Sequence, residues 1–109
     1  LSTFQSLDID DTEEDVKTSP GQVYGYFILN AAASTRYVKF YNDTAANVVV
    51  GTTAPVMTLP IPAGNAANLM GAHGILFSVA ICVAATTGVA NNDTGAPAAN
   101  DVQITVWFK

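Results

Sequence analysis

Large apolar residues occupy every second position in several short stretches of this chain. In one uncharged stretch, residues 74–90, every second position from 75 to 83 is large: Ile75, Phe77, Val79, Ile81 and Val83. A period of two places alternate side chains on the two faces of a β-strand, whereas an amphipathic helix needs apolar residues three and four positions apart. No window of the chain keeps that helical spacing over three turns. The alternation therefore predicts an all-β protein.

The same alternation recurs along the chain, in stretches rich in Val, Ile, Tyr, Phe and Thr that are separated by Gly, Pro and Asn. Such stretches are typical of strands. The strands predicted in this way cover residues 22–30, 35–41, 47–50, 55–61, 66–70, 74–90 and 101–109. About seven or eight short strands joined by turns are typical of an antiparallel sandwich or barrel, and we predict a β-sandwich of the jelly-roll or immunoglobulin-like kind.

The uncharged stretch 74–90 also approaches the shortest length of a membrane-spanning helix. Its period of two favours a long strand whose bulky side fills a core. Small residues such as Cys82 and Ala84 stand on the other side of that strand. They predict a close neighbour there, either another chain or a tightly packed loop. Because the stretch is expected to be a strand and not a membrane-spanning helix, we expect no membrane partner.

Acidic residues are concentrated near the start of the chain. Six of the nine acids lie in one short run, the acidic segment: Asp8, Asp10, Asp11, Glu13, Glu14 and Asp15. From Val16 onward three acids face four bases, so the rest of the chain is almost neutral. A nucleic-acid-binding protein needs a basic patch for the phosphates, and this chain has none. We expect no nucleic-acid partner.

The acidic segment belongs to a leader that has few large apolar residues. Such a segment cannot bury enough surface to order itself alone. We therefore expect an extended acidic N-terminal arm of residues 1–21 and a sandwich domain of residues 22–109. The arm could be solvated and self-repelling, or it could lie along a neighbouring subunit. The second interpretation assigns a subunit or capsid interface to Phe4, Leu7, Asp8, Ile9, Asp10, Asp11, Glu13, Glu14 and Asp15.

Candidate catalytic and metal-binding residues are few. His73 is the only histidine and is expected in an exposed turn, and Cys82 is the only cysteine and is expected in the core. The acidic segment does not match a calcium-binding EF-hand loop, because Glu13 and Ser19 stand where that loop needs glycine and glutamate. No Gly-x-Ser-x-Gly motif is present. We predict no enzymatic activity, no cofactor and no metal site.

Two further features leave alternatives open. Residues 86–100 form a long connection of small residues, and loops of this kind tend to be functional or mobile. Four tyrosines lie at alternate positions of predicted strands: Tyr24, Tyr26, Tyr37 and Tyr41. They could line a sugar-binding face, or they could stabilise neighbouring strands as cross-strand pairs.

Several blocks of the sequence, in order, carry a resemblance to a known family. The blocks are VYGY (23–26), ASTRYVKFYN (33–42), TAPVMTLPIPAG (53–64), GILFS (74–78), VAATTG (83–88) and ANDV (99–102). With them, residues 22–109 resemble a small β-sandwich module that is common among the virion structural proteins of tailed bacteriophages. Some of these modules are capsid decoration (cement) proteins, and others are parts of fibres or tails.

The resemblance implies a structural role and no catalytic residues. We expect a virion protein that decorates and stabilises the outer surface of the capsid, with the major capsid protein and further copies of itself, often as a homotrimer, as partners. The composition agrees, because 12% charged residues is about half the usual fraction and such a surface favours contact with neighbours. The alternatives are a fibre or tail component that binds host-surface glycans, and a secreted adhesin-like module.

Overall fold

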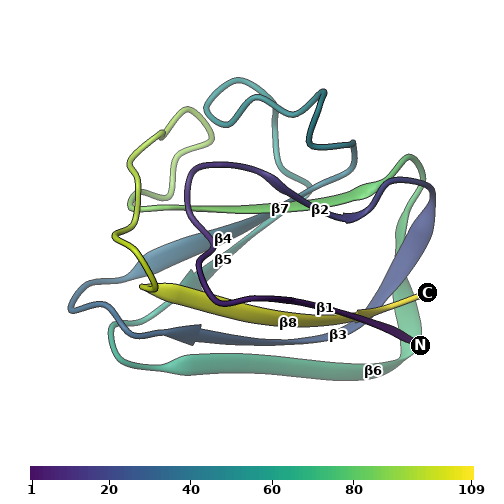
Figure 1. Ribbon diagram of the computed structural model, residues 1–109, viewed down its shortest axis with the longest axis horizontal. Coiled ribbons are helices and arrows are strands. Elements are labelled where there is room, and N and C mark those ends of the chain that lie inside the picture. The colour runs from purple at the N-terminus through teal and green to yellow at the C-terminus, as the bar shows by residue number, and fades with distance from the viewer.

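The computed structural model describes residues 1–109, which form eight strands and no helix. The strands are β1 (Ser2–Ser6), β2 (Glu14–Lys17), β3 (Gly21–Asn30), β4 (Arg36–Tyr41), β5 (Met57–Ile61), β6 (Ala66–Phe77), β7 (Ile81–Thr86) and β8 (Val102–Phe108). A first antiparallel sheet has the order β1-β8-β3-β6, and a second has the order β2-β7-β4-β5 (Figure 1). The predicted all-β sandwich is confirmed. With no helix in the chain, none is available to span a membrane.

The alternating large residues build one core between the two sheets. Phe40 of β4 lies near its centre, with its ring 6.1 Å from that of Tyr26 and 6.3 Å from that of Phe77. Each fully buried side chain of this size contributes about 1.5–3 kcal/mol to folding. The buried members of the core are Ile9, Val16, Val23, Ile28, Val38, Phe40, Ile61, Phe77, Ile81, Val83, Ala85, Val102, Ile104 and Val106.

The prediction of a single strand over residues 74–90 is wrong. The structure ends β6 at Phe77 and begins β7 at Ile81, so the stretch is divided between the two sheets. The Asn42 side chain holds the turn between them, because its Oδ1 accepts a hydrogen bond from the backbone N–H of Val79 (2.9 Å). The alternation of large residues continues through this turn, so the sequence period does not reveal it.

Two loops cover the outer face of the second sheet, at the top of Figure 1. Residues 42–56 form one of them, and the predicted strand over 47–50 is part of this loop instead. Residues 87–101 form the other. Beneath the first loop lies a small second core of four buried residues: Tyr41, Val48, Cys82 and Ala84. The small side of β7 therefore faces a tightly packed loop, one of the two neighbours that the sequence allowed.

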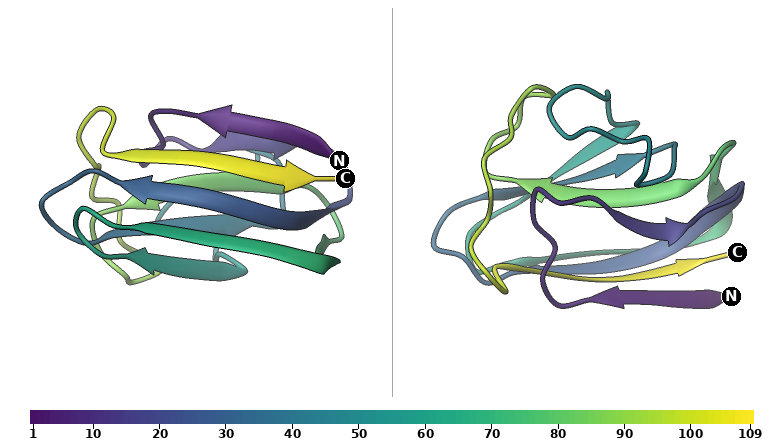
Figure 2. Two further views of the ribbon diagram at one scale, coloured as in Figure 1. Left: turned by 90° about the horizontal axis from the view of Figure 1, so that it is seen from below. Right: turned by 45° about the horizontal axis from the view of Figure 1, so that its top comes forward.

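Residues 1–21 do not form a separate arm. β1 pairs with β8 and β2 pairs with β7, so this segment contributes an edge strand to each sheet (Figure 2, purple). Ile9 is fully buried between them, and its N–H donates a hydrogen bond to the Val102 carbonyl (3.0 Å). The expectation was wrong because the segment does not have to order itself alone. β7 and β8 supply the missing backbone partners, and Ile9 and Val16 enter the common core.

This placement predicts unequal effects of two nearby substitutions. Ile9→Ala should lower the free energy of unfolding by about 2–4 kcal/mol, because it opens a cavity in the core. Leu7→Ala should lower it by less than about 0.5 kcal/mol, because Leu7 is 56% exposed. Urea denaturation measures both values. A cost for Ile9→Ala as small as that for Leu7→Ala would show that the segment lies outside the core.

Candidate assembly surface

Charge is divided unequally between the two sheets. The four strands of the first sheet contain no Asp, Glu, Lys or Arg. The strands of the second sheet contain Glu14, Asp15, Lys17, Arg36 and Lys39. No loop crosses the outer face of the first sheet, which is seen from below in Figure 2, left. We call this uncovered, uncharged surface the open face.

The open face carries large apolar side chains. Phe27 in β3 is 44% exposed, and Met70 in β6 is 65% exposed. Gly25 lets side chains of the flanking strands approach closely, because a methyl group there would lie 2.5 Å from Met70 Sδ and 3.3 Å from Cε3 of Trp107. Both side chains therefore close over the glycine, an arrangement that suits sulfur–aromatic contact. Contiguous exposed apolar groups of this kind mark interaction surfaces.

A shallow hollow of about 150 Å³ lies on the open face between β1, β8 and β3. Its lining combines two amides, one hydroxyl and one aromatic ring with aliphatic groups, and it includes no charged residue. The lining residues are Gln5, Leu7, Phe27, Leu29, Gln103, Ile104 and Thr105. This composition suits a neutral ligand or an uncharged protein surface.

The structure divides the candidate interface that the sequence assigned to the N-terminal segment. Phe4 packs against the core and Ile9 is part of it, so neither is free to anchor the chain on a neighbour. Leu7 remains exposed and lines the hollow of the open face. The apolar part of the predicted interface is therefore wrong for Phe4 and Ile9, because the chain's own core takes them up.

Four carboxylates of the acidic segment accept hydrogen bonds from this chain. The donors are Asn100 N to Asp8 (2.9 Å), Thr12 N to Asp10 (2.9 Å), Ser6 Oγ to Glu14 (3.1 Å) and Ala45 N to Asp15 (2.7 Å). No carboxylate of the segment forms an ion pair, since the one ion pair of the chain joins Arg36 to Asp101 (3.3 Å). The segment therefore helps to position neighbouring loops while its charge stays uncompensated.

Burial raises the pKa of Glu14 above its ordinary value, and the nearby carboxylates of Asp10 and Asp8 raise it further. The hydrogen bond from the Ser6 hydroxyl lowers it in part. The group is therefore held in a place that disfavours its charged form.

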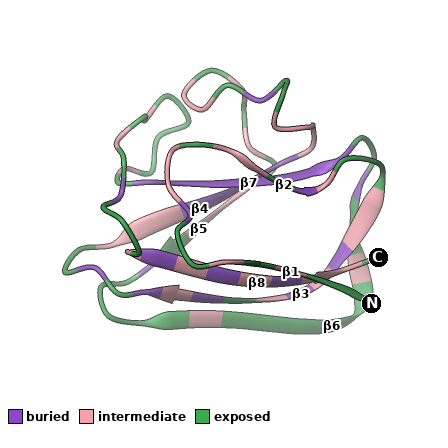
Figure 3. Cartoon of the chain, in the orientation of Figure 1, coloured by how far each residue is buried: buried purple, intermediate pink, exposed green.

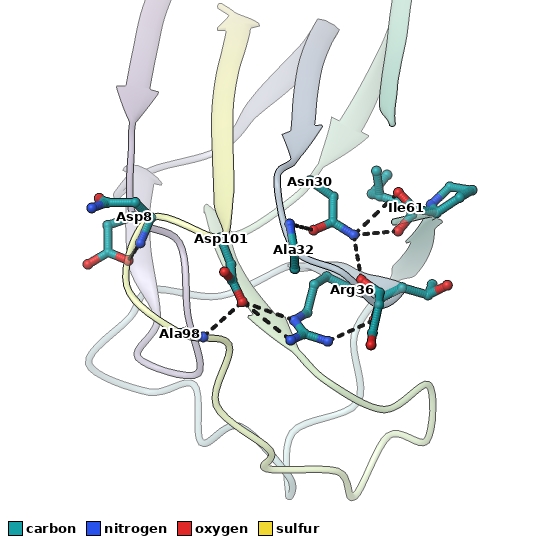
Figure 4. A network of polar contacts seen from close by, with 11 residues as sticks. Asp8, Asn30, Ala32, Arg36, Ile61, Ala98 and Asp101 are labelled. Atoms are coloured by element: carbon teal, nitrogen blue, oxygen red, sulfur yellow. Dashed lines mark hydrogen bonds and ion pairs between the residues drawn. The ribbon is translucent and has the colours of Figure 1, made fainter. Parts of the chain in front are cut away.

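A buried amide ties three segments together at one end of the sandwich (Figure 4). Asn30 is fully buried, and its Nδ2 donates to the carbonyls of Ser34 and Ile61, both at 2.9 Å. Its Oδ1 accepts from the N–H of Ala32 (2.9 Å). This residue was not among those predicted from the sequence. The sequence does mark it, because Asn30 is a polar residue two positions after Ile28 and therefore on the same, core-facing side of the strand.

The Arg36–Asp101 pair closes the same end of the molecule (Figure 4). Asp101 also accepts a hydrogen bond from the N–H of Ala98 (3.0 Å), so one carboxylate joins β4 to the loop before β8. Ion pairs near the surface add little to overall stability, so the main contribution of this pair is to position the loop before β8.

The long loop 87–101 is held by a buried lysine. Lys39 lies in β4, and its Nζ donates to the Ala90 carbonyl (2.7 Å). Burial lowers the pKa of Lys39, and the nearby Asp93 carboxylate partly offsets this effect. Asp93 in turn accepts hydrogen bonds from the N–H groups of Gly88 (3.2 Å) and Gly95 (2.8 Å). These contacts give the loop a fixed path over the second sheet.

The remaining reactive side chains are dispersed. Burial raises the pKa of Cys82 to about 12 and that of Tyr41 to about 12, so both side chains are neutral at physiological pH. His73 lies in the exposed strand β6 and not in the turn expected for it. The tyrosines do not share one face, since Tyr26 packs on the core and Tyr41 lies beneath a loop. No three His, Cys, Asp or Glu side chains are grouped to hold a metal ion.

Comparisons with known protein families, with curated proteins and with solved structures find no match to this chain.

The Asn30 network predicts a large effect of removing one amide. Asn30→Ala should lower the free energy of unfolding by about 2–3 kcal/mol, because it leaves buried carbonyls and an N–H without partners. Asn91→Ala, in an exposed part of the loop 87–101, should cost less than about 0.5 kcal/mol. Chemical denaturation compares the two. Equal costs would contradict a structural role for the Asn30 amide.

The raised pKa of Glu14 predicts a pH-dependent effect of neutralising it. In the interval between its unfolded and folded pKa values the native state binds more protons, so the contribution of Glu14 to stability falls as the pH rises through that interval. Glu14→Gln keeps an acceptor for Ser6 and should raise Tm by roughly 2 °C at pH 7, with little change at pH 3. Calorimetry at both pH values measures this. A lower Tm at pH 7 would contradict it.

Proposed function

We propose that this chain is a structural virion protein that decorates and stabilises the outer surface of a tailed-phage capsid. The observation that carries the proposal is the open face, which combines exposed apolar side chains with strands that contain no charged residue. Covering an uncharged surface has a small desolvation cost, so a neighbouring protein can bind it closely. The resemblance of residues 22–109 to virion modules supplies the kind of neighbour.

The proposed mechanism is additive. Each copy contributes a small contact across a joint between capsid subunits, and many such contacts stiffen the shell together. The partners are the major capsid protein and further copies of this chain, which the resemblance expects as homotrimers. The acidic segment would repel a phosphate backbone, so we propose no nucleic-acid partner. No catalytic role is part of the proposal.

The acidic segment has a secondary place in this mechanism. Leu7 lies on the open face and Asp8, the first residue of the acidic segment, follows it directly, and we call this junction the acidic rim. Such a rim would favour basic groups on the shell and would orient each copy as it approaches.

The hollow favours a second candidate function. Gln5, Gln103 and Thr105 offer neutral hydrogen-bonding groups around the exposed ring of Phe27. Amides beside an aromatic ring suit a neutral sugar, whose polar and apolar sides would meet the two kinds of group. In this alternative the chain belongs to a fibre or tail and binds host-surface glycans.

A substitution on the open face tests the first proposal. Phe27→Asp places a charge in the contact and should reduce the number of copies on purified capsids at least about tenfold, because burying an unpaired carboxylate is costly. Quantitative mass spectrometry of particles from the phage that encodes the chain measures the copy number. Val89→Asp is the matched control, since Val89 is 58% exposed in the loop over the second sheet.

The results separate the two candidates. Wild-type copies in numbers comparable with the major capsid protein, lost on Phe27→Asp and kept on Val89→Asp, support decoration. A few copies per particle, together with glycan-array binding that Phe27→Asp abolishes, would support the fibre or tail alternative and overturn decoration.

A further inference from the structure

The four edge strands of the sandwich differ in how they avoid pairing with other chains. Natural edge strands are protected by charges, prolines, bulges or short length. β2 has four residues, three of them charged, and a register shift. β5 contains Pro60, which has no N–H to donate. β1 is short and is followed by the acidic segment. β6 has twelve residues and none of Asp, Glu, Lys, Arg or Pro.

Exposed apolar side chains are concentrated on β6. Of the eleven exposed large apolar residues of the chain, four lie in this strand: Leu69, Met70, Ile75 and Leu76. They form two adjacent pairs, so each pair places one side chain on either face of the strand. Figure 3 shows the exposure continuing along almost the whole strand. The free edge is therefore apolar on both of its faces.

The straight part of this edge is short. Ala66 to Met70 pair regularly with β3, but residues 71–74 stand opposite Tyr24 alone and form a bulge. The Asn30 N–H donates to the carbonyl of Asn65, the residue directly opposite it (2.9 Å). Hydrogen-bonded pairs alternate with non-hydrogen-bonded pairs along an antiparallel ladder, so Ala67 and Leu69 bond to β3 and the residues between them do not. It follows that the backbone N–H and C=O groups of Ala66, Asn68 and Met70 point away from β3. These groups are available to another strand.

We propose that β6 pairs antiparallel with β6 of a second copy of this chain, centred on Asn68, so that the two first sheets become one continuous sheet. About six backbone hydrogen bonds would join the two edges in this register. The contact is isologous, because the same residues face each other across a twofold axis.

The sequence of the edge is complementary to itself in this register. Small residues face large ones, Ala66 opposite Met70 and Ala67 opposite Leu69, while the two Asn68 amides face each other. Two copies of β6 also meet without charge repulsion, whereas two copies of β2 would bring Glu14 and Asp15 together. Self-complementarity in both size and charge favours a second copy over an unrelated strand.

The contact is small. Five residues from each copy bury less than the roughly 1,200 Å² of a stable interface, so pairing should be weak in solution. Copies held side by side on a shell have a high effective concentration, which makes such a contact sufficient there. The inference concerns the contact between copies and does not depend on the shell. It predicts a dimer, unlike the trimer that the resemblance implies.

Opposite charges placed at Asn68 test the pairing. Asn68→Asp and Asn68→Lys each bring like charges together across the twofold axis, and each should weaken dimerisation at least about tenfold. An equimolar mixture of the two variants should restore it, because Asp then faces Lys. Asn91→Asp and Asn91→Lys are the matched controls on an exposed loop. Sedimentation velocity from about 10 μM to about 1 mM, with circular dichroism to check the fold, measures the result.

The expected result is a concentration-dependent wild-type dimer, monomeric single variants, a dimer in the mixture and no effect of the Asn91 variants. A wild-type monomer at the highest concentration, a trimer, or Asn68 variants that dimerise like the wild type would each overturn the proposal. Failure of the mixture to dimerise would also overturn it. If the β6 pairing is overturned but the chain still binds capsids, the proposal of capsid decoration stands. The two proposals can therefore fail independently.

Discussion

Each sheet of a sandwich has a second face that the common core does not cover, and the two sheets of this protein differ in what happens to that face. The second sheet carries all the charged strand residues, and two loops lie over it. Lys39 donates a hydrogen bond to the loop 87–101, and the small second core around Tyr41 and Cys82 holds the loop 42–56. The first sheet has neither charges nor a cover. The exposed apolar surface of the open face and the uncharged edge of β6 both belong to this uncovered sheet.

Period-two alternation was sufficient to predict the all-β class and the central strands. Residues 22–30, 35–41 and 101–109 correspond closely to β3, β4 and β8, because one face of each strand fills the core and the other face does not. The alternation was insufficient where the large residues continued through a turn, as at Val79. It also failed at residues 47–50, where an apolar run packs as a loop on Tyr41 and Cys82.

Tertiary pairing explains what the sequence could not reveal about the candidate surfaces. Residues 1–21 are ordered by β7 and β8, which lie far along the chain, so no local property of the segment indicates its strands. The uncharged composition of the open face was visible in the sequence. The grouping of those strands into one sheet was not. The partners of Asn30 could not be predicted either, because they are backbone groups that come close to it only where the ends of β3 and β5 meet.

The open face and the free edge of β6 are continuous, so the two proposals describe neighbouring parts of one uncharged surface. Hydroxyl-radical footprinting of the free protein and of assembled particles tests this account most directly, because Phe27, Met70 and Trp107 are reactive groups on that surface. The account predicts that assembly protects these three side chains and leaves the loops 42–56 and 87–101 as reactive as before. Protection of the two loops, with unchanged oxidation of the first sheet, would contradict it.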